Sequence, residues 1–173
     1  MDFFDVLKNR RSVRGYTPEI IEEEKLKKIL EAVNCAPSAG NLQAYEVVLI
    51  RDAKQRKRIA EACLGQDFIA EAAVILVFCA NLEVSSSRYG SRGIGLYAIQ
   101  DATIACTYAQ LACTAQGLSS CWIGAFNEKK AAEAISAPKE VKIVAVLPVG
   151  YPAKAPVETT RREISELVKE EKF

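Results

Sequence analysis

The chain has 173 residues and a formal net charge of +1, with 50% apolar and 26% charged residues. This composition is that of an ordinary globular protein, and we predict one domain over residues 1–173. The lack of a basic surplus argues against bulk nucleic-acid binding. The chain contains no histidine, which excludes the common Ser-His-Asp and Cys-His catalytic systems and zinc sites of the H-E-x-x-H kind.

Apolar spacing predicts helices that alternate with strands along the first half of the chain. Apolar residues at positions i, i+3, i+4 and i+7 indicate amphipathic helices, and a continuous apolar run indicates a strand buried on both faces. In chain order, these signals predict a helix over residues 2–8, a helix from 22 to about 36, a strand over 45–50, a helix over 53–63 and a strand over 73–80.

The second half begins with residues 81–95, which are rich in serine and glycine and predict a long flexible loop. Residues 96–116 predict a helix that is apolar on nearly every side, and a chain this small needs a second subunit to cover such a helix. The remaining elements are predicted as an extended segment over 122–126, a helix over 127–135, a strand over 142–150 and a charged helix over 161–171. The pattern indicates one sheet between helices, of the α+β or α/β class.

Two features bear on the environment of the chain. The N-terminal sequence has acids where a signal peptide has basic residues, and polar residues interrupt the longest apolar stretch, 94–118. We therefore expect a cytoplasmic protein that does not bind membranes. The six cysteines include no C-x-x-C pair, so we expect reduced thiols and no metal site.

Four stretches carry candidate functional residues. The cluster of Arg10, Arg11, Ser12 and Arg14 follows the first helix, and guanidinium and hydroxyl groups suit phosphate oxygens. Taken alone, this cluster is more typical of a solvated charged turn, because isolated basic clusters are common on protein surfaces. Two further arginines, Arg161 and Arg162, follow a turn marked by glycine and proline.

The other two stretches point to a flat ligand. The loop APSAGNLQ, residues 36–43, offers amide groups that can bind the edge of a planar heterocycle, although capping loops favour the same residues. In SSCWIGAF, residues 119–126, Trp122 is typical of a core, whereas Gly124 lets a backbone N–H approach a flat ligand closely.

In their order and spacing, these motifs and the sequence GQDFIAEA resemble the nitroreductase family of flavoproteins, over about residues 3–168. The resemblance implies an α+β fold, with a central sheet flanked by helices, in an intertwined homodimer that binds FMN at its interface. It implies that FMN is held by Arg10, Arg11, Ser12 and Arg14 of one subunit, by Pro37, Ser38, Ala39 and Asn41 of the other, by Gln66 at the ring edge, by Ile123 and Gly124 along the ring, and by Arg161 or Arg162 at the phosphate.

The activity that the resemblance implies is hydride transfer from NADH or NADPH through the flavin to a nitroaromatic, a quinone or a similar small acceptor, by a ping-pong mechanism. No side chain is predicted to be catalytic, because the flavin carries the hydride and the Gly124 backbone lies near its N5 atom. Two alternatives stay open. One is the same fold with other flavin chemistry, such as reductive dehalogenation or flavin breakdown, and the other is a basic binding module without redox activity.

Overall fold

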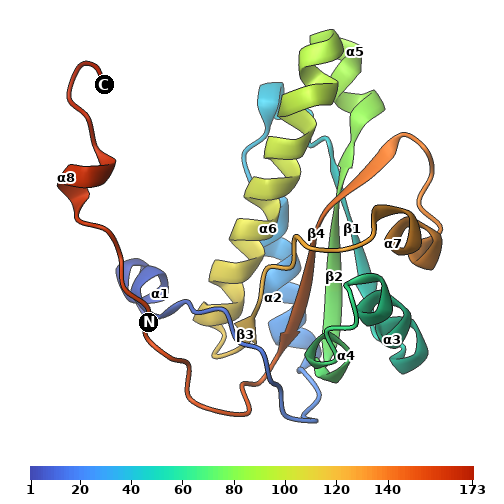
Figure 1. Ribbon diagram of the computed structural model, residues 1–173, viewed down its shortest axis with the longest axis vertical. Helices are drawn as coiled ribbons and strands as arrows, with labels where there is room; N and C mark the ends of the chain where they lie inside the picture. The colour runs from blue at the N-terminus through green and yellow to red at the C-terminus, as the bar shows by residue number, and fades with distance from the viewer.

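A four-stranded antiparallel sheet divides the molecule into two helical layers (Figure 1). The computed structural model describes residues 1–173. The strands lie in the order β1 (Tyr45–Ile50), β2 (Val74–Asn81), β4 (Val141–Gly150) and β3 (Ser119–Ser120). This arrangement confirms the predicted α+β class, and the apolar run at 73–80 is the central strand β2, which is buried from Val74 to Ala80.

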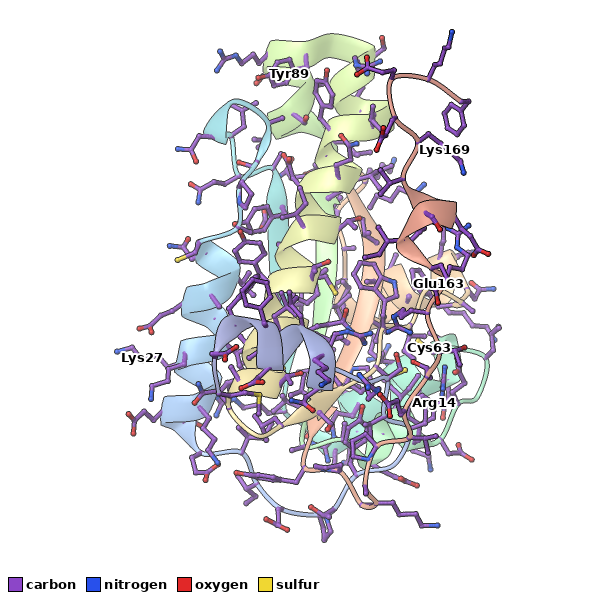
Figure 2. All side chains as sticks on the ribbon, turned by 90° about the vertical axis from the view of Figure 1, so that its left-hand side faces the viewer. Arg14, Lys27, Cys63, Tyr89, Glu163 and Lys169 are labelled. Carbon is purple, nitrogen blue, oxygen red and sulfur yellow. The ribbon has the colours of Figure 1, made fainter.

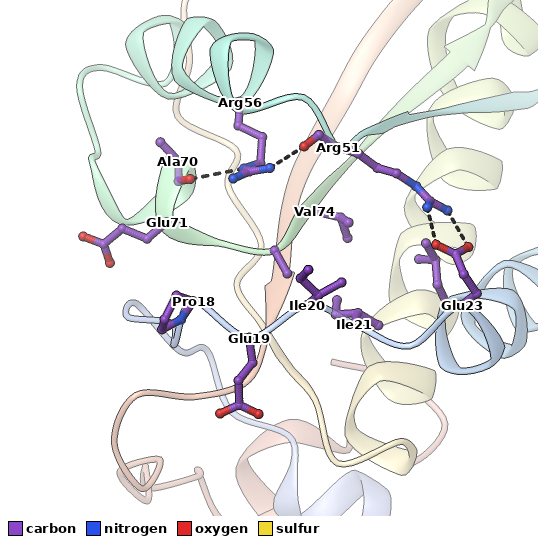
Figure 3. Close-up of a pocket in the computed structure, with 12 residues that line it drawn as sticks. Pro18, Glu19, Ile20, Ile21, Glu23, Arg51, Arg56, Ala70, Glu71 and Val74 are labelled. Carbon is purple, nitrogen blue, oxygen red and sulfur yellow. Dashed lines mark hydrogen bonds and ion pairs between the residues drawn. The ribbon is translucent and has the colours of Figure 1, made fainter.

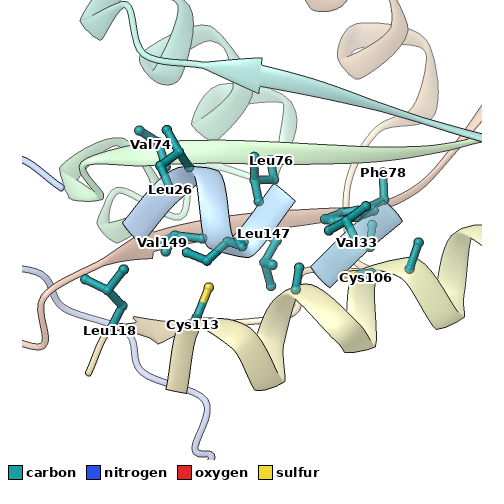
Figure 4. Packing of buried hydrophobic residues seen from close by; sticks show 14 of the residues in the cluster. Leu26, Val33, Val74, Leu76, Phe78, Cys106, Cys113, Leu118, Leu147 and Val149 are labelled. Carbon is teal, nitrogen blue, oxygen red and sulfur yellow. The ribbon is translucent and has the colours of Figure 1, made fainter. Parts of the chain in front are cut away.

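The two faces of the sheet bury two separate cores. One face packs against α2 (Glu23–Asn34) and α6 (Ala98–Ala115), and the other against α3 (Ala53–Ala62), α4 (Phe68–Glu71) and α7 (Glu128–Ile135). Because strand side chains alternate between faces, Leu76 and Phe78 of β2 enter the first core and Ile75 and Val77 enter the second. Figure 4 shows the first core, where Leu76, Phe78 and Leu147 meet side chains of α2 and α6.

Local signals explain where several helices begin. Asp2 caps α1 (Phe3–Asn9) in a capping box with Asp5, and Asn127 caps α7 by accepting a hydrogen bond from the backbone N–H of Lys130 at 3.0 Å. The helix starts predicted at these caps are therefore confirmed. The one-turn helix α4 and the two-residue strand β3 were not predicted, because elements this short give no periodic signal.

The predicted loop at 81–95 is wrong, because these residues form α5 (Leu82–Arg92) and a π-turn (Gly93–Tyr97) that leads directly into α6. Asn81 caps α5, and the hydroxyls of Ser86 and Ser87 donate to carbonyl oxygens one turn earlier, at 2.9 and 2.8 Å. Serine is therefore accommodated inside the helix. The helix breaks at Gly90, whose φ of 55° reverses the chain.

Two further predictions need correction. One side of α6 is partly or fully open to solvent, at Ile104, Thr107, Tyr108 and Leu111, so the helix is not buried all round within one chain. The predicted helix over 161–171 shrinks to the single turn α8 (Ile164–Leu167), and residues 153–173 are exposed throughout. Figure 1 shows this tail leaving the body of the molecule and passing α1. None of the helices is both long enough and apolar enough to span a membrane.

Candidate functional site

The arginine-bearing segment after α1 is extended and lies along the edge of the sheet. Ser12 pairs with Ser120 of β3, and the backbone N–H of Val13 donates to Ser120 O at 3.1 Å. Tyr16 pairs with Pro152, and its buried hydroxyl donates to Val13 O at 2.9 Å. This pairing fixes the backbone of the cluster next to both β3 and the turn that follows β4.

The arginines of this segment lie close to Arg161 of the C-terminal tail. Burial lowers the pKa of the Arg10 guanidinium, and the nearby charges of Arg161 and Arg11 lower it further. Only Arg11 has a carboxylate partner, Glu158 at 3.6 Å. Arg10, Arg14 and Arg161 form no ion pair. The structure thus concentrates positive charge here with a single carboxylate, Glu158, to offset it, and a net positive charge favours anion binding.

A pocket of about 530 Å³ opens beside this cluster. It lies between the extended segment and the start of the tail, and it is lined by Ser12, Val13, Arg14, Gly15, Ala153, Lys154, Ala155, Pro156, Val157 and Thr159. Lys154 is a cation that the sequence motifs did not single out. Arg162 is exposed and makes no hydrogen bond or ion pair, so of the two tail arginines only Arg161 joins the cluster.

The segment after β3 brings an unpaired backbone donor to the same side of the sheet. Ile123 exchanges hydrogen bonds with Val146 of β4, at 2.9 and 3.0 Å. The next residue, Gly124, is exposed, and its N–H has no hydrogen-bond partner. A Cβ atom there would meet nothing closer than Trp122 Nε1 at 3.6 Å, so the space over this backbone is open to a flat ligand.

Gln66 lies in the connection between α3 and α4, where its side-chain amide donates to Cys63 O at 2.9 Å. The segment of Gly124 reaches this connection, because the N–H of Asn127 donates to Ala62 O at 2.8 Å. The structure therefore brings the end of α3, which precedes Gln66, against the segment that carries Gly124.

Cys121 lies beneath the arginine cluster. Its thiol is fully buried and faces Ser12, Arg14 and Arg10. Burial raises the pKa of this thiol, and the positive charge of Arg14, the Ser12 hydroxyl and Arg10 only partly offset that effect. The thiol is therefore protonated at neutral pH.

The loop of Pro37, Ser38, Ala39 and Asn41 lies elsewhere, beside the N-terminal end of α6. Ser38 Oγ accepts from the N–H of Gln43 at 2.9 Å, and the backbone has positive φ at Gly40, Asn41 and Gln43. Such a backbone is strained and persists only where its surroundings hold it. A pocket of about 450 Å³ lies between this loop and the start of α6, lined by Pro37, Ser38, Ala39, Tyr97, Gln100, Asp101, Thr103 and Ile104.

Asp101 anchors this loop, and the sequence motifs did not point to it. Its carboxylate is 2% exposed, and Oδ1 accepts from the N–H of Ala39 at 2.9 Å, whereas Oδ2 has no partner. Burial raises the pKa of this carboxyl group, and the nearby backbone N–H groups of Ala39 and Ala44 partly offset that effect. The only signal in the sequence was that Asp101 is the one charged residue of this helix.

The two groups of candidate residues lie at opposite ends of α6. The helix has 18 residues, so its ends are about 27 Å apart at about 1.5 Å per residue. Its first turn holds the loop through Asp101, and its last turn leads to β3, which pairs with Ser12. Figure 2 shows the same separation, with Arg14 labelled near one end of the molecule and Tyr89, which adjoins the loop, near the other. One chain therefore presents two half sites.

A different pocket, shown in Figure 3, contains none of the predicted site residues. Its volume is about 450 Å³, and it lies between the start of α2 and the α3–α4 region. Arg51 is paired with Glu23, with one contact of 2.8 Å, and Arg56 donates to the carbonyl oxygens of Ala70 and Arg51. Because these arginines are already satisfied within the chain, this pocket is a poor anion site.

Comparison with known proteins identifies the fold and the sequence pattern. The model of the nitroreductase family matches residues 7–66 and 63–151. An FMN reductase [NAD(P)H] of Bacillus subtilis is 34% identical over 164 residues, which cover 85% of this chain and 64% of that protein. An NADH dehydrogenase of Thermus thermophilus is 30% identical over 172 residues, which cover 84% of each chain.

The solved structure of the hypothetical oxidoreductase YcnD from Bacillus subtilis superposes with a TM-score of 0.92 at 30% identity, over 100% of this chain and 75% of that one. Fold, family model and sequence identity therefore agree with the motifs around the arginine cluster, the loop and the segment of Gly124. The chain belongs to the nitroreductase family.

Proposed function

We propose that this chain is an FMN-dependent NAD(P)H oxidoreductase. The observation that carries the proposal is the convergence of Arg10, Arg14 and Arg161, without neutralising acids, on the side of the sheet where Gly124 presents a free N–H. This pair of features matches a ligand that has a phosphate at one end and a flat ring system at the other. The family membership and the FMN reductase among the relatives support the same cofactor.

The residues present fit FMN. Arg10, Ser12, Arg14 and Arg161 provide guanidinium and hydroxyl donors for phosphate and ribityl oxygens, and Arg11 supports them through Glu158 on the tail. Ile123 and Gly124 provide an open backbone edge for the ring, and Gln66 lies on the same side. We assign Arg161 to the phosphate, because it lies beside Arg10, whereas Arg162 makes no hydrogen bond or ion pair with the rest of the chain.

When bound, FMN accepts a hydride from the nicotinamide donor and passes electrons to an acceptor, so the chain itself supplies binding and orientation. The free Gly124 N–H would donate a hydrogen bond to the bound ring. The Cys121 thiol is buried and faces Ser12. We propose that donor and acceptor use the site in turn, in a ping-pong scheme, and that nitroaromatics or quinones are the acceptor class.

The separation of the half sites supports a homodimer. If FMN contacts both the arginine cluster and the loop of Pro37, Ser38, Ala39 and Asn41, the two must come from different chains, because about 27 Å of helix separates them within one. The partly open side of α6 and the exposed apolar tail residues, among them Ile164 and Val168, offer surfaces for that contact. The intertwined arrangement of a family homodimer meets both needs.

The test of the proposed function is the purified protein itself. Bound FMN gives a yellow protein, and oxidation of the reduced protein under anaerobic conditions, screened against nitroaromatics, quinones and halogenated aromatics, identifies the acceptor. Reoxidation by the first two classes supports the proposal. Preference for a halogenated acceptor would instead favour reductive dehalogenation, and a colourless protein that FMN does not restore would contradict the proposal altogether.

The assembly gives one prediction. Sedimentation of the FMN-loaded protein at micromolar concentration is expected to give twice the chain mass of 18.9 kDa. The physical reason is that each cofactor is held by half sites from two chains. A stable monomer that retains FMN would show that one chain holds the cofactor alone.

The protonation of Cys121 gives another prediction. With no histidine and with the Cys121 pKa raised by burial, no side chain at the site titrates near neutrality. Flavin reduction by NADH, followed by stopped-flow absorbance, is therefore expected to vary little between pH 6 and 8. NADH is the donor of choice because it has no phosphate monoester that titrates near pH 6. A steep profile that Cys121→Ser flattens would make the thiol a participant.

A further inference from the structure

Four side chains of α5 and the π-turn form one stack, which we call the Arg-Tyr stack: Arg88, Tyr89, Tyr97 and Arg92. The two tyrosine rings meet edge to face, with centroids 5.0 Å apart at 89°. The guanidinium carbon of Arg88 lies 5.5 Å from the centroid of the Tyr89 ring, and that of Arg92 lies 5.3 Å from the Tyr97 ring. Arg92 Nε also donates to Tyr97 Oη at 2.8 Å. Cation–π contacts thus hold both arginines in place.

The backbone makes this stack a fixed feature. Gly90 reverses the chain with φ 55° and ψ −137°, and Gly93 lies so close to α5 that an added Cβ would be 2.5 Å from Ser85 O. Only glycine permits this approach. The two halves of the hairpin therefore pack together, and each arginine lies against one of the two tyrosine rings.

The stack adjoins the half site of the loop. A Cβ at Gly40 would overlap Tyr89 Oη and lie 2.8 Å from Arg88 Nη1. Tyr97 lines the pocket of about 450 Å³ together with Pro37, Ser38 and Ala39. Arg88 therefore lies next to the loop at Gly40, and Arg92 is bonded to Tyr97, which lines the pocket.

Neither Arg88 nor Arg92 is neutralised. Both are exposed, and neither forms an ion pair, in contrast to Arg51, which is bound to Glu23. The only hydrogen bond of Arg92 is the one to Tyr97. Their remaining N–H donors are free, and two unneutralised cations on one stack favour a ligand group that carries more than one negative charge.

We infer that the Arg-Tyr stack binds the 2′-phosphate of NADPH and makes the protein select NADPH over NADH. The inference rests on the proposed function. Of the two substrates in that function, only the nicotinamide donor must carry phosphate, since quinones and nitroaromatics need none. A phosphate monoester has a charge of about −1.5 to −2 at pH 7, which matches two guanidinium groups, and it is the single group that distinguishes the two donors.

The first measurement compares donors. In Arg88→Gln/Arg92→Gln, kcat/KM for NADPH is expected to fall about tenfold or more, as the loss of a charge-assisted contact implies, while kcat/KM for NADH changes less than about twofold. The matched control is Arg58→Gln, since Arg58 is an exposed arginine of α3 that bonds only to Gln55. An equal loss with both donors would assign the stack to the pyrophosphate instead, and no loss with either would remove it from the donor site; both results overturn the inference.

A second measurement is independent of turnover. Calorimetric titration of the FMN-loaded protein with adenosine 2′,5′-bisphosphate and with AMP separates the 2′-phosphate from the rest of the ligand. The wild type is expected to bind the bisphosphate more tightly, by about tenfold or more, and the double variant is expected to bind both alike. Equal affinities in the wild type would overturn the inference while leaving the proposed function intact. A protein that holds no FMN would overturn both.

Discussion

Replacing both Arg10 and Arg14 with alanine is expected to weaken FMN binding by about a hundredfold or more. Each charge-assisted hydrogen bond contributes about 1.5–3 kcal/mol, and about 1.4 kcal/mol is a factor of ten in affinity, so each single variant loses about tenfold or more. The fold is expected to survive, because neither arginine forms an ion pair within the chain. Removal of the Arg10 side chain also relieves its electrostatic repulsion with Arg161 and Arg11.

The dissociation constant is measured by the quenching of FMN fluorescence on titration of the apoprotein. Arg14→Lys keeps the charge without the planar fork and should lie between wild type and Arg14→Ala. Arg58→Ala is the control for general loss of charge. Undiminished FMN affinity in the double variant would place the phosphate elsewhere on the molecule.

Asp101→Ala is expected to lower the free energy of unfolding by about 1–3 kcal/mol, the usual cost of leaving a buried donor without its partner. The donor is the N–H of Ala39, which the Asp101 carboxylate now accepts at 2.9 Å. The strained loop that follows then loses its anchor, so FMN affinity should fall as well. Asp101→Asn keeps an oxygen acceptor in the same place, so it should lower neither the free energy of unfolding nor FMN affinity.

The pH dependence distinguishes the charge of Asp101 from its shape. Its pKa in the folded chain is raised above the ordinary value of 3.8, so the folded state binds the proton more tightly than the unfolded state. This contribution to stability is present below that value and is lost as pH rises through the folded pKa. The difference in unfolding free energy between wild type and Asp101→Asn, measured by urea denaturation across this window, should therefore shift toward the Asn variant as pH rises. A difference independent of pH would show that folding does not change the pKa of this carboxyl group.

Sequence patterns predicted the elements whose signals are local. The apolar run of β2 and the caps at Asp2 and Asn127 act within a few residues, and the structure has each where expected. The prediction for residues 81–95 was wrong, because the glycines there suggested a flexible loop. In the structure Gly90 reverses the chain and Gly93 allows close packing against Ser85, and neither contact can be read from composition.

The candidate site divides in the same way. The arginine cluster and the segment of Gly124 are each continuous in the sequence, so their residues could be predicted as site residues directly. Asp101 acts on Ala39, which is 62 residues earlier in the chain, and Arg161 meets Arg10 only through the path of the tail. Such pairs depend on tertiary structure, and a single sequence has no local signal for them.

The position of the two half sites at opposite ends of α6 has a genetic consequence. If each cofactor takes its arginines from one chain and its loop from the other, a mixed dimer of an Arg14 variant and an Asp101 variant unites both defects in one site and leaves the other site intact. Random pairing makes about half of the dimers mixed, so about a quarter of all sites recover. Two alleles of this one gene that each impair FMN binding would then complement each other, because activity depends on the pair of chains.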